Sequence, residues 1–241
     1  MPLVPLLPSS IVLGIDSFAP AVPEKLEVKR ALSSSELLRC RELVYEAYAQ
    51  KGYLLEDTFE ARRGGTFHSN RTHASPAARR TGQVFFVESA PQVVAATGTL
   101  IRQGPGDLST LPLWKPVKAE LIKLSQSLGP DAVLAEMGGL ASTGQGSGTL
   151  RALRTGVWDG DALTTLFAGM HANAQAQGIT DLVIGVHPSH TGFYRRLGFT
   201  AVGATVQEGL PDYAGLQHAA LALLHAPLED MLCAQATPIR H

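Results

Sequence analysis

The residues with the most chemical potential lie close together between His187 and Phe199. Pro188 follows His187 at the end of an apolar run, and proline suits the first turn of a helix. Tyr194 comes seven residues after His187, and a phenol held near a leaving group can act as a general acid. Tyr194 thus carries a group that is capable of proton transfer. The alternative is that Phe193 and Tyr194 only pack a helix against a sheet.

A second candidate catalytic residue is Glu136, which lies inside the apolar segment 133–141. This segment predicts a buried strand. A carboxylate inside a sheet can act as a general base, directly or through one water molecule. The alternative is a buried or edge glutamate paired with an arginine, and the residues alone leave both interpretations open.

Other types of reactive site are not expected. His187 and His190 have a spacing compatible with metal binding, but no third ligand accompanies them, so no metal site is predicted. Cys40 and Cys233 are the only cysteines, and neither belongs to a C-x-x-C pair. Neither has the context of a nucleophile, which favours direct attack on a substrate over a covalent enzyme intermediate. The low cysteine content also favours a reducing, cytoplasmic setting.

A mixed sheet flanked by helices is predicted to position these groups. Ser33 and Glu36 have the spacing of a capping box, and Gly178 suits the end of a later helix. Segments 83–88 and 92–101 are expected to form an antiparallel hairpin. The predicted strands are 27–32, 83–88, 92–101, 133–141, 181–186, 201–206 and 219–224, and the predicted helices are 33–51, 117–128, 163–174 and 188–197.

Length and composition indicate one large domain in a chain of 241 residues. We expect an extended or disordered leader at 1–23, the domain at 24–226 and a tail at 227–241. The leader carries five prolines and no basic region, and no later segment is apolar for long enough to span a membrane. The net charge of −1 argues against a dedicated nucleic-acid-binding protein.

The spacing of the His187 segment resembles the C-terminal signature of the GNAT acyltransferase superfamily. In that signature a polar residue ends the fifth strand, a tyrosine follows seven positions later, and Gly-Phe stands four and five positions after the tyrosine. His187, Tyr194, Gly198 and Phe199 keep these spacings, with histidine in place of the common asparagine. The resemblance implies the α/β (α+β) GNAT acyl-CoA N-acyltransferase fold, a mixed splayed β-sheet flanked by helices. It also implies that Tyr194 protonates the leaving thiolate of a thioester.

The superfamily's pyrophosphate-binding motif, R/Q-x-x-G-x-G/A, is matched in part. Gly160 and Ala162 fit its small residues, where helix N-terminal N–H groups hold the cofactor phosphates. Val157 replaces the polar first residue, and Asp159 and Asp161 add negative charge where a diphosphate would lie. Repulsion disfavours coenzyme A and favours a donor with a single phosphodiester. Asp161 has a simpler explanation as a helix N-cap.

A narrower resemblance, from about Arg41 to Leu224, is to the long-chain N-acyl amino acid synthases, relatives of the acyl-homoserine-lactone synthases. It implies an acyl carrier protein thioester as donor, an amino acid amine as acceptor and no tightly bound cofactor. The matching pieces are Arg41 to Tyr45, Gly52-Tyr53, Gly98 to Leu100, Leu111 to Leu113 with Glu120, Ala135-Glu136, Leu140-Ala141 and His187 to Phe199.

The same resemblance implies a binding site for the donor's phosphopantetheine arm, carried by either acyl carrier protein or coenzyme A. The residues assigned to it are Met137, Gly138, Gly139, Leu140, Gly160, Ala162 and His187. Backbone groups of the fourth strand would polarise the thioester carbonyl. The basic segment 62–80, with Arg151 and Arg154, offers positive charge to an acidic carrier protein, or is simply a solvated surface.

Two other functions stay open. Members of the synthase family commonly carry Glu-x-x-Arg on the fourth strand, whereas Met137, Gly138 and Gly139 follow Glu136 in this chain. A coenzyme A-dependent acetyltransferase is the first alternative. The second is a catalytically inactive GNAT domain that only binds an acyl ligand or a partner.

Overall fold

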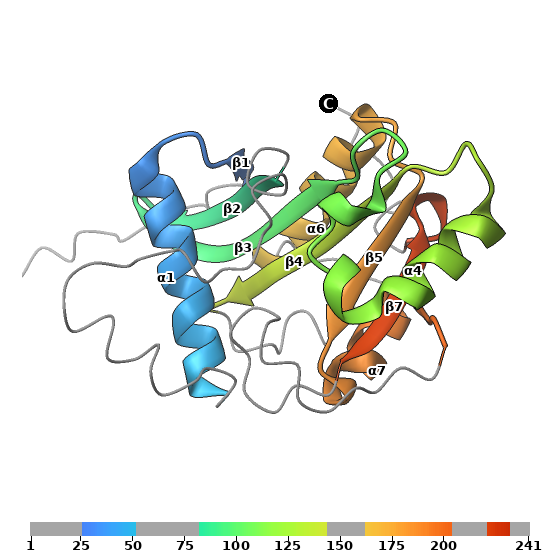
Figure 1. Cartoon of the computed structure of the whole chain (residues 1–241). Helices are drawn as coiled ribbons and strands as arrows, with labels where there is room; N and C mark the ends of the chain where they lie inside the picture. Colours follow the sequence, from blue (N-terminus) through green and yellow to red (C-terminus); the bar gives the residue numbers. More distant parts are fainter. Residues whose placement is uncertain (1–25, 52–81, 144–161, 204–220, 232–241) are drawn as a thin grey trace, which may run out of the picture.

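The computed structural model describes residues 26–51, 82–143, 162–203 and 221–231, and the description below is of these residues. They contain a seven-stranded sheet in the order β1-β2-β3-β4-β5-β7-β6 (Figure 1). The strands are β1 (Val28–Arg30), β2 (Gly82–Ala90), β3 (Val93–Arg102), β4 (Leu134–Ser142), β5 (Asp181–Val186), β6 (Thr200–Ala201) and β7 (Ala222–Pro227). Only β4 and β5 pair in parallel.

Helices cover both faces of this sheet, which confirms the predicted layers (Figure 1). The α-helices are α1 (Ser34–Gln50), α4 (Trp114–Leu128), α6 (Ala162–Ala176) and α7 (Thr191–Arg196), and the 3-10 turns are η2 (Leu108–Thr110), η3 (Pro188–His190) and η4 (Leu228–Asp230). None of the helices in the described ranges is both long and apolar enough to cross a membrane.

Alternation along the strands divides the core between the two faces. Phe85 and Met137 pack with Phe167 of α6 on one face. The other face is shared by two helices. Cys40 and Leu43 of α1 pack on Phe86 and Ala141, and Leu121 and Leu124 of α4 pack on Ile101 and Leu134. The site described below therefore has α6 on one side and the pair α1 and α4 on the other.

Several elements differ from their predicted positions. The predicted helix 188–197 consists of η3 and α7. Strand β6 covers only Thr200–Ala201, whereas a strand was predicted at 201–206, of which 204–206 lie outside the described residues. Helix α4 begins at Trp114, before the apolar repeat at 117. Val117 has non-helical dihedral angles (φ −134°, ψ 38°), so a kink separates this first turn, which contains Pro116, from the rest of the helix. Strand β7 is shifted by three residues from the predicted 219–224. Its position is set by pairing with the whole of β5, from Asp181 opposite Pro227 to Val186 opposite Ala222. Leu228 and Met231, beyond the expected end of the domain, are buried in the core.

The capping box of α1 is present as predicted. The Ser33 side chain accepts from the backbone N–H of Glu36, and the Glu36 carboxylate accepts from the backbone N–H groups of Ser33 and Leu32 at 2.8 and 2.9 Å. These hydrogen bonds lower the pKa of Glu36 from its ordinary 4.5 to about 2, and the bond from the backbone N–H of Ser33 has the largest effect.

Because the pKa of Glu36 is lowered in the folded protein, its carboxylate stabilises the fold above pH 4.5, and this stabilisation is lost as the pH falls toward 2. We therefore expect Glu36→Gln to destabilise the protein at pH 6, and the difference from wild type to shrink toward pH 2.5. Urea unfolding at both pH values measures it. Glu42→Gln, on the exposed part of the same helix, is the control. A difference that is the same at both pH values would contradict the cap as its source.

Gly198 has a structural reason to be glycine. Its φ is +101°, and a Cβ built there would lie 2.7 Å from the carbonyl oxygen of Asp230. We expect Gly198→Ala to lower the free energy of unfolding by about 1–3 kcal/mol. Gly192→Ala in α7, where a Cβ meets no described atom within 4 Å, is the matched control. Equal stability of the two variants in urea titrations would show that the contact with Asp230 is not limiting.

Candidate active site

Strands β4 and β5 stop pairing part-way along the sheet. Their ladder runs only from Leu134 opposite Asp181 to Met137 opposite Ile184. Beyond it β4 continues to Ser142 beside β3, and β5 continues to Val186 beside β7. The last residues of the two strands therefore do not pair with each other, and their facing backbone groups are available to a ligand. We call the region between these unpaired strand ends the splay.

A β-bulge shapes the β4 side of the splay. Thr97 of β3 pairs with Ala141, whereas Thr99 pairs with Gly138, so β4 holds one extra residue between these pairs. Gly139 lies in the bulge with φ +57°, a left-handed conformation that favours glycine. The bulge turns the backbone between Gly138 and Leu140 away from the regular ladder. These residues were assigned to donor binding, and the structure places them at the splay.

His187 ends β5 on the other side of the splay. Its Nδ1 accepts from the backbone N–H of Ser189 at 3.3 Å and lies 2.7 Å from the Ser189 hydroxyl. His187 thus caps η3, the turn that leads into α7, and Pro188 occupies the first helical position as predicted. Its ring centroid is 6.3 Å from that of His190. The two histidines and Tyr194 therefore belong to one compact corner after β5.

Tyr194 is half-buried among aromatic rings of the α6 side. Its ring lies edge-on to Phe193 at 5.0 Å and to Phe199 at 5.9 Å. Burial, followed by the proximity of Tyr48, raises the pKa of the Tyr194 phenol above its ordinary value of 10. The phenol therefore keeps its proton at neutral pH, which is the state that a general acid needs.

The carboxyl end of α1 contributes residues that sequence reasoning missed. Tyr48 acts on the pKa of Tyr194 from α1, which covers the face opposite α6. Lys51 likewise acts on His190, whose pKa is lowered, first by burial and then by this charge. In the sequence, the helical period of 33–51 indicates only that Tyr48 lies on the packed face of a helix. No local signal connects α1 with α7, because their contact depends on the tertiary fold.

Glu136 is buried, with 2% of its surface exposed, on the face that carries α1 and α4. Its Oε2 accepts from the backbone N–H of Leu113 at 2.7 Å. Leu113 precedes the first turn of α4, where free N–H groups and the helix dipole stabilise a carboxylate. Glu136 therefore lies one residue before the end of the β4–β5 ladder, with its side chain held by the start of α4.

Part of the predicted site lies outside the described residues. This holds for Gly160, Asp159 and Asp161 of the partial pyrophosphate motif, and for the basic segment 62–80 with Arg151 and Arg154. Ala162 is described and begins α6.

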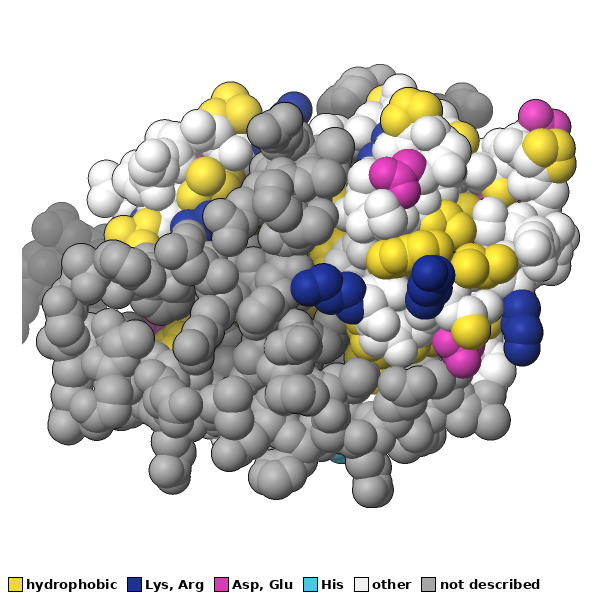
Figure 2. Space-filling view, in the orientation of Figure 1, with side chains coloured by type: hydrophobic (Ala, Val, Ile, Leu, Met, Phe, Trp, Pro, Cys, Tyr) yellow, Lys and Arg dark blue, Asp and Glu magenta, His cyan; other side chains and the backbone are white. Residues whose placement is uncertain are grey.

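Exposed cations do occur on described helices. Arg195 and Arg196 end α7, directly after Tyr194. Helix α4 carries Lys115, Lys118 and Lys123, and Figure 2 shows Lys and Arg side chains on the α4 side of the molecule. The Lys118 ammonium lies 5.0 Å from the centre of the Trp114 ring. A net charge near zero thus coexists with basic helix surfaces that suit an anionic ligand or partner.

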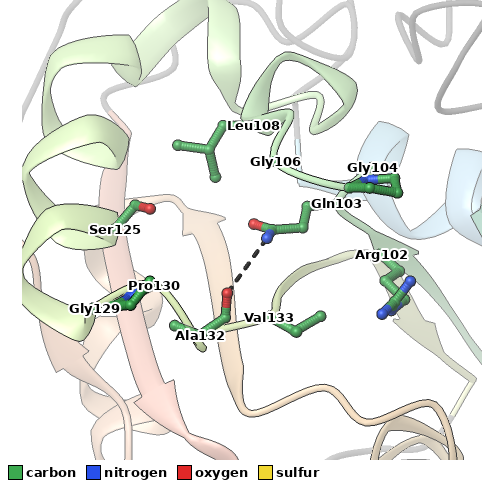
Figure 3. A pocket seen from close by; sticks show the side chains of 11 residues that line it. Arg102, Gln103, Gly104, Gly106, Leu108, Ser125, Gly129, Pro130, Ala132 and Val133 are labelled. Carbon is green, nitrogen blue, oxygen red and sulfur yellow. Dashed lines mark hydrogen bonds between the residues drawn. The ribbon is translucent and has the colours of Figure 1, made fainter.

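A second hollow lies at the other end of the sheet, between the end of β3, the loop after it and the end of α4 (Figure 3). The Gln103 amide donates to the carbonyl of Ala132 at 3.4 Å inside it. Ser125 and Leu108 line the hollow but offer no acid or base. The hollow is separate from the splay and from the groups around Tyr194.

Comparison with known proteins decides the family. The family model described as "N-acyl amino acid synthase FeeM" matches residues 39–226, which is most of the chain. The chain belongs to this family. No curated protein matches the sequence.

The synthase is also similar to solved structures. The structure of FeeM, an N-acyl amino acid synthase from uncultured soil microbes, is 21% identical with a TM-score of 0.60, over 87% of this chain and 97% of that chain. An N-acetyltransferase from Lactobacillus plantarum, described as putative in its title, is 11% identical with a TM-score of 0.49, over 85% and 99%. The AHL synthase LasI is 10% identical with a TM-score of 0.48, over 84% and 89%.

The family and the fold confirm two predictions from the sequence. The chain has the GNAT fold, and it is an acyltransferase of the N-acyltransferase class.

Proposed function

We propose that this synthase transfers a medium or long acyl chain from an acyl carrier protein thioester to the amine of an amino acid. The observation that carries the proposal is the splay, which has a buried carboxylate, Glu136, on one side and a protonated phenol, Tyr194, on the other. A thioester lying between them would have a base for the nucleophile and an acid for the leaving group.

The reaction proceeds by direct attack. The amine nitrogen adds to the thioester carbonyl carbon, the carbon–nitrogen bond forms and the carbon–sulfur bond breaks. Glu136 takes the proton that the amine loses, directly or through one water molecule, and Tyr194 gives its proton to the sulfur. Backbone N–H groups of the bulge between Gly138 and Leu140 stabilise the oxyanion that develops on the carbonyl oxygen. The products are an N-acyl amino acid and a free thiol.

The donor's phosphopantetheine arm would lie along the splay, against the unpaired edges of β4 and β5. His187 at the end of β5 and Ala162 at the start of α6 border that path. The neighbouring Arg195 and Arg196 are exposed and suit the acidic surface of a carrier protein, where complementary charge mainly raises the association rate. In the sequence, Asp159 and Asp161 disfavour a diphosphate, which supports carrier protein over coenzyme A.

A product search by mass spectrometry tests donor and acceptor together. The full chain is incubated with a mixed amino acid pool and with medium and long acyl groups, carried either by acyl carrier protein or by coenzyme A. N-acyl amino acid formed only from the carrier protein is the expected result. Product only from coenzyme A would overturn the donor assignment and restore the conventional acyl-CoA-dependent reading.

The alternative to an enzyme is a catalytically inactive domain that only binds an acyl ligand or a partner. It is suggested by the absence, on the fourth strand, of the arginine that is common in the family. It predicts that acyl carrier protein raises the melting temperature of the synthase while no product forms with either donor.

A further inference from the structure

Helices α1 and α4 pack on different parts of the sheet face that carries Glu136. Strands β3 and β4 have buried residues beneath each of these two helices. Thr97 and Ala141 are 1% and 6% exposed under α1, and Ile101 and Glu136 are 7% and 2% exposed on the α4 side.

The paired residues between these buried residues are Thr99 and Gly138, and both are half-exposed. Among the described residues of β3 and β4 on this face, Thr99 and Gly138 are therefore more exposed than their neighbours.

Gly138 lies at the start of the β4 bulge, but neither its φ nor packing among the described residues requires glycine. Its φ lies outside the left-handed region, in contrast to Gly139 at +57°. No atom of the described residues lies within 4 Å of a Cβ built at Gly138, so packing among these residues does not demand its absence. In a strand, glycine gives up side-chain packing and backbone rigidity. A glycine inside a strand often marks a bulge, as here, or a place where a ligand approaches the backbone closely.

The position of Gly138 indicates what kind of ligand would approach it. Residues two apart on a strand lie on the same face about 7 Å from each other, which brings Gly138 within the span of one small molecule from Glu136. Gly138 is also the first β4 residue beyond the ladder with β5, where the thioester would lie. An amine that gives its proton to Glu136 and attacks at the splay would hold the rest of its body over Gly138 and Thr99.

Resting on the proposed function, we infer that Gly138 sets the upper limit on the size of the acceptor's side chain. The acceptor's side chain would lie above Gly138, where no described atom is within 4 Å of a Cβ built at this position, and the Thr99 hydroxyl offers a hydrogen bond to the acceptor's polar groups. A larger residue at 138 would occupy the space of the acceptor's side chain, while Glu136 and Tyr194 keep their own side chains. The enzyme would then accept small amino acids and reject large ones.

The test compares wild type, Gly138→Ala and Gly138→Val with glycine, alanine, leucine and phenylalanine as acceptors. We expect Gly138→Val to lower kcat/KM for phenylalanine relative to glycine by about 10- to 200-fold, the usual range for steric discrimination in a pocket. Most of the change should be a rise in KM. Gly138→Ala should give a smaller change in the same direction. Gly192→Ala, the matched substitution at an unconstrained glycine, should leave the ratio unchanged, and melting temperatures check folding.

The outcomes separate this inference from the function on which it rests. If wild type forms no N-acyl product with any acceptor, the proposed function fails and this inference fails with it. If wild type is active and Gly138→Val lowers kcat/KM equally for all four acceptors, or leaves their ratios unchanged, the size limit is elsewhere and the inference alone is overturned.

Discussion

Replacing Tyr194 with phenylalanine is expected to lower kcat by about 100- to 10,000-fold, the range for loss of a general acid. The phenol is half-buried and its pKa is raised, so it is protonated throughout the neutral and mildly alkaline range. Without its proton the sulfur must leave as a thiolate. Stability should change little, because the ring still packs edge-on against Phe193 and Phe199.

The leaving group provides the sharpest control for this prediction. A donor that is an aryl thioester with a strongly acidic thiol needs no proton on departure. The deficit of Tyr194→Phe, measured as the ratio of wild-type to variant kcat, should therefore shrink with that donor. An equal deficit with both donors would mean that Tyr194 positions the substrate and does not protonate it. Because the pKa is raised, Tyr194 should also impose no alkaline decline in kcat below about pH 10.

Glu136→Gln is expected to have the second large effect, again a loss of about 100- to 10,000-fold in kcat. The amide oxygen can still accept from the backbone N–H of Leu113, so the start of α4 keeps its hydrogen bond. Losing the charge on that bond should cost about 1 kcal/mol of stability. This substitution therefore separates the proton transfer from the structural role.

The pH profile decides between the two roles of Glu136. If it is the base, the rise of wild-type kcat/KM from acid pH should follow its ionisation and disappear in Glu136→Gln. Glu229→Gln, at an exposed position in η4, should keep the wild-type profile. A Glu136→Gln enzyme with reduced rate but an unaltered profile would show that the carboxylate only supports α4 and β4.

Local patterns predicted the parts of the fold whose causes are local. The strand Asp181–Val186 and the corner after it follow from an apolar run, a proline and a fixed spacing to Tyr194. The capping box at Ser33 follows from two residues three positions apart. In each case the interacting groups are neighbours in the chain, so the sequence contains the whole interaction.

The missing parts depend on distant groups. The bulge at Gly139 requires the register between β3 and β4, and a Gly-Gly pair in a strand does not specify which residue is extra. The proximity of Tyr48 to Tyr194 depends on how α1 lies across the sheet. The bond from Leu113 to Glu136 was unforeseen for the same reason, since it joins residues 23 positions apart.

The short ladder between β4 and β5 has a mechanical consequence. The sheet consists of two antiparallel blocks, β1 to β4 and β5 to β7, held together by the four residue pairs from Leu134 to Met137. Each block is stiffened by its own hydrogen bonds, so bending of the sheet concentrates at this narrow junction. A donor arm that bonds to both free edges would add rungs where the protein has none. The bound donor would then connect the two blocks of the sheet, and the enzyme should be more rigid with donor bound than without it.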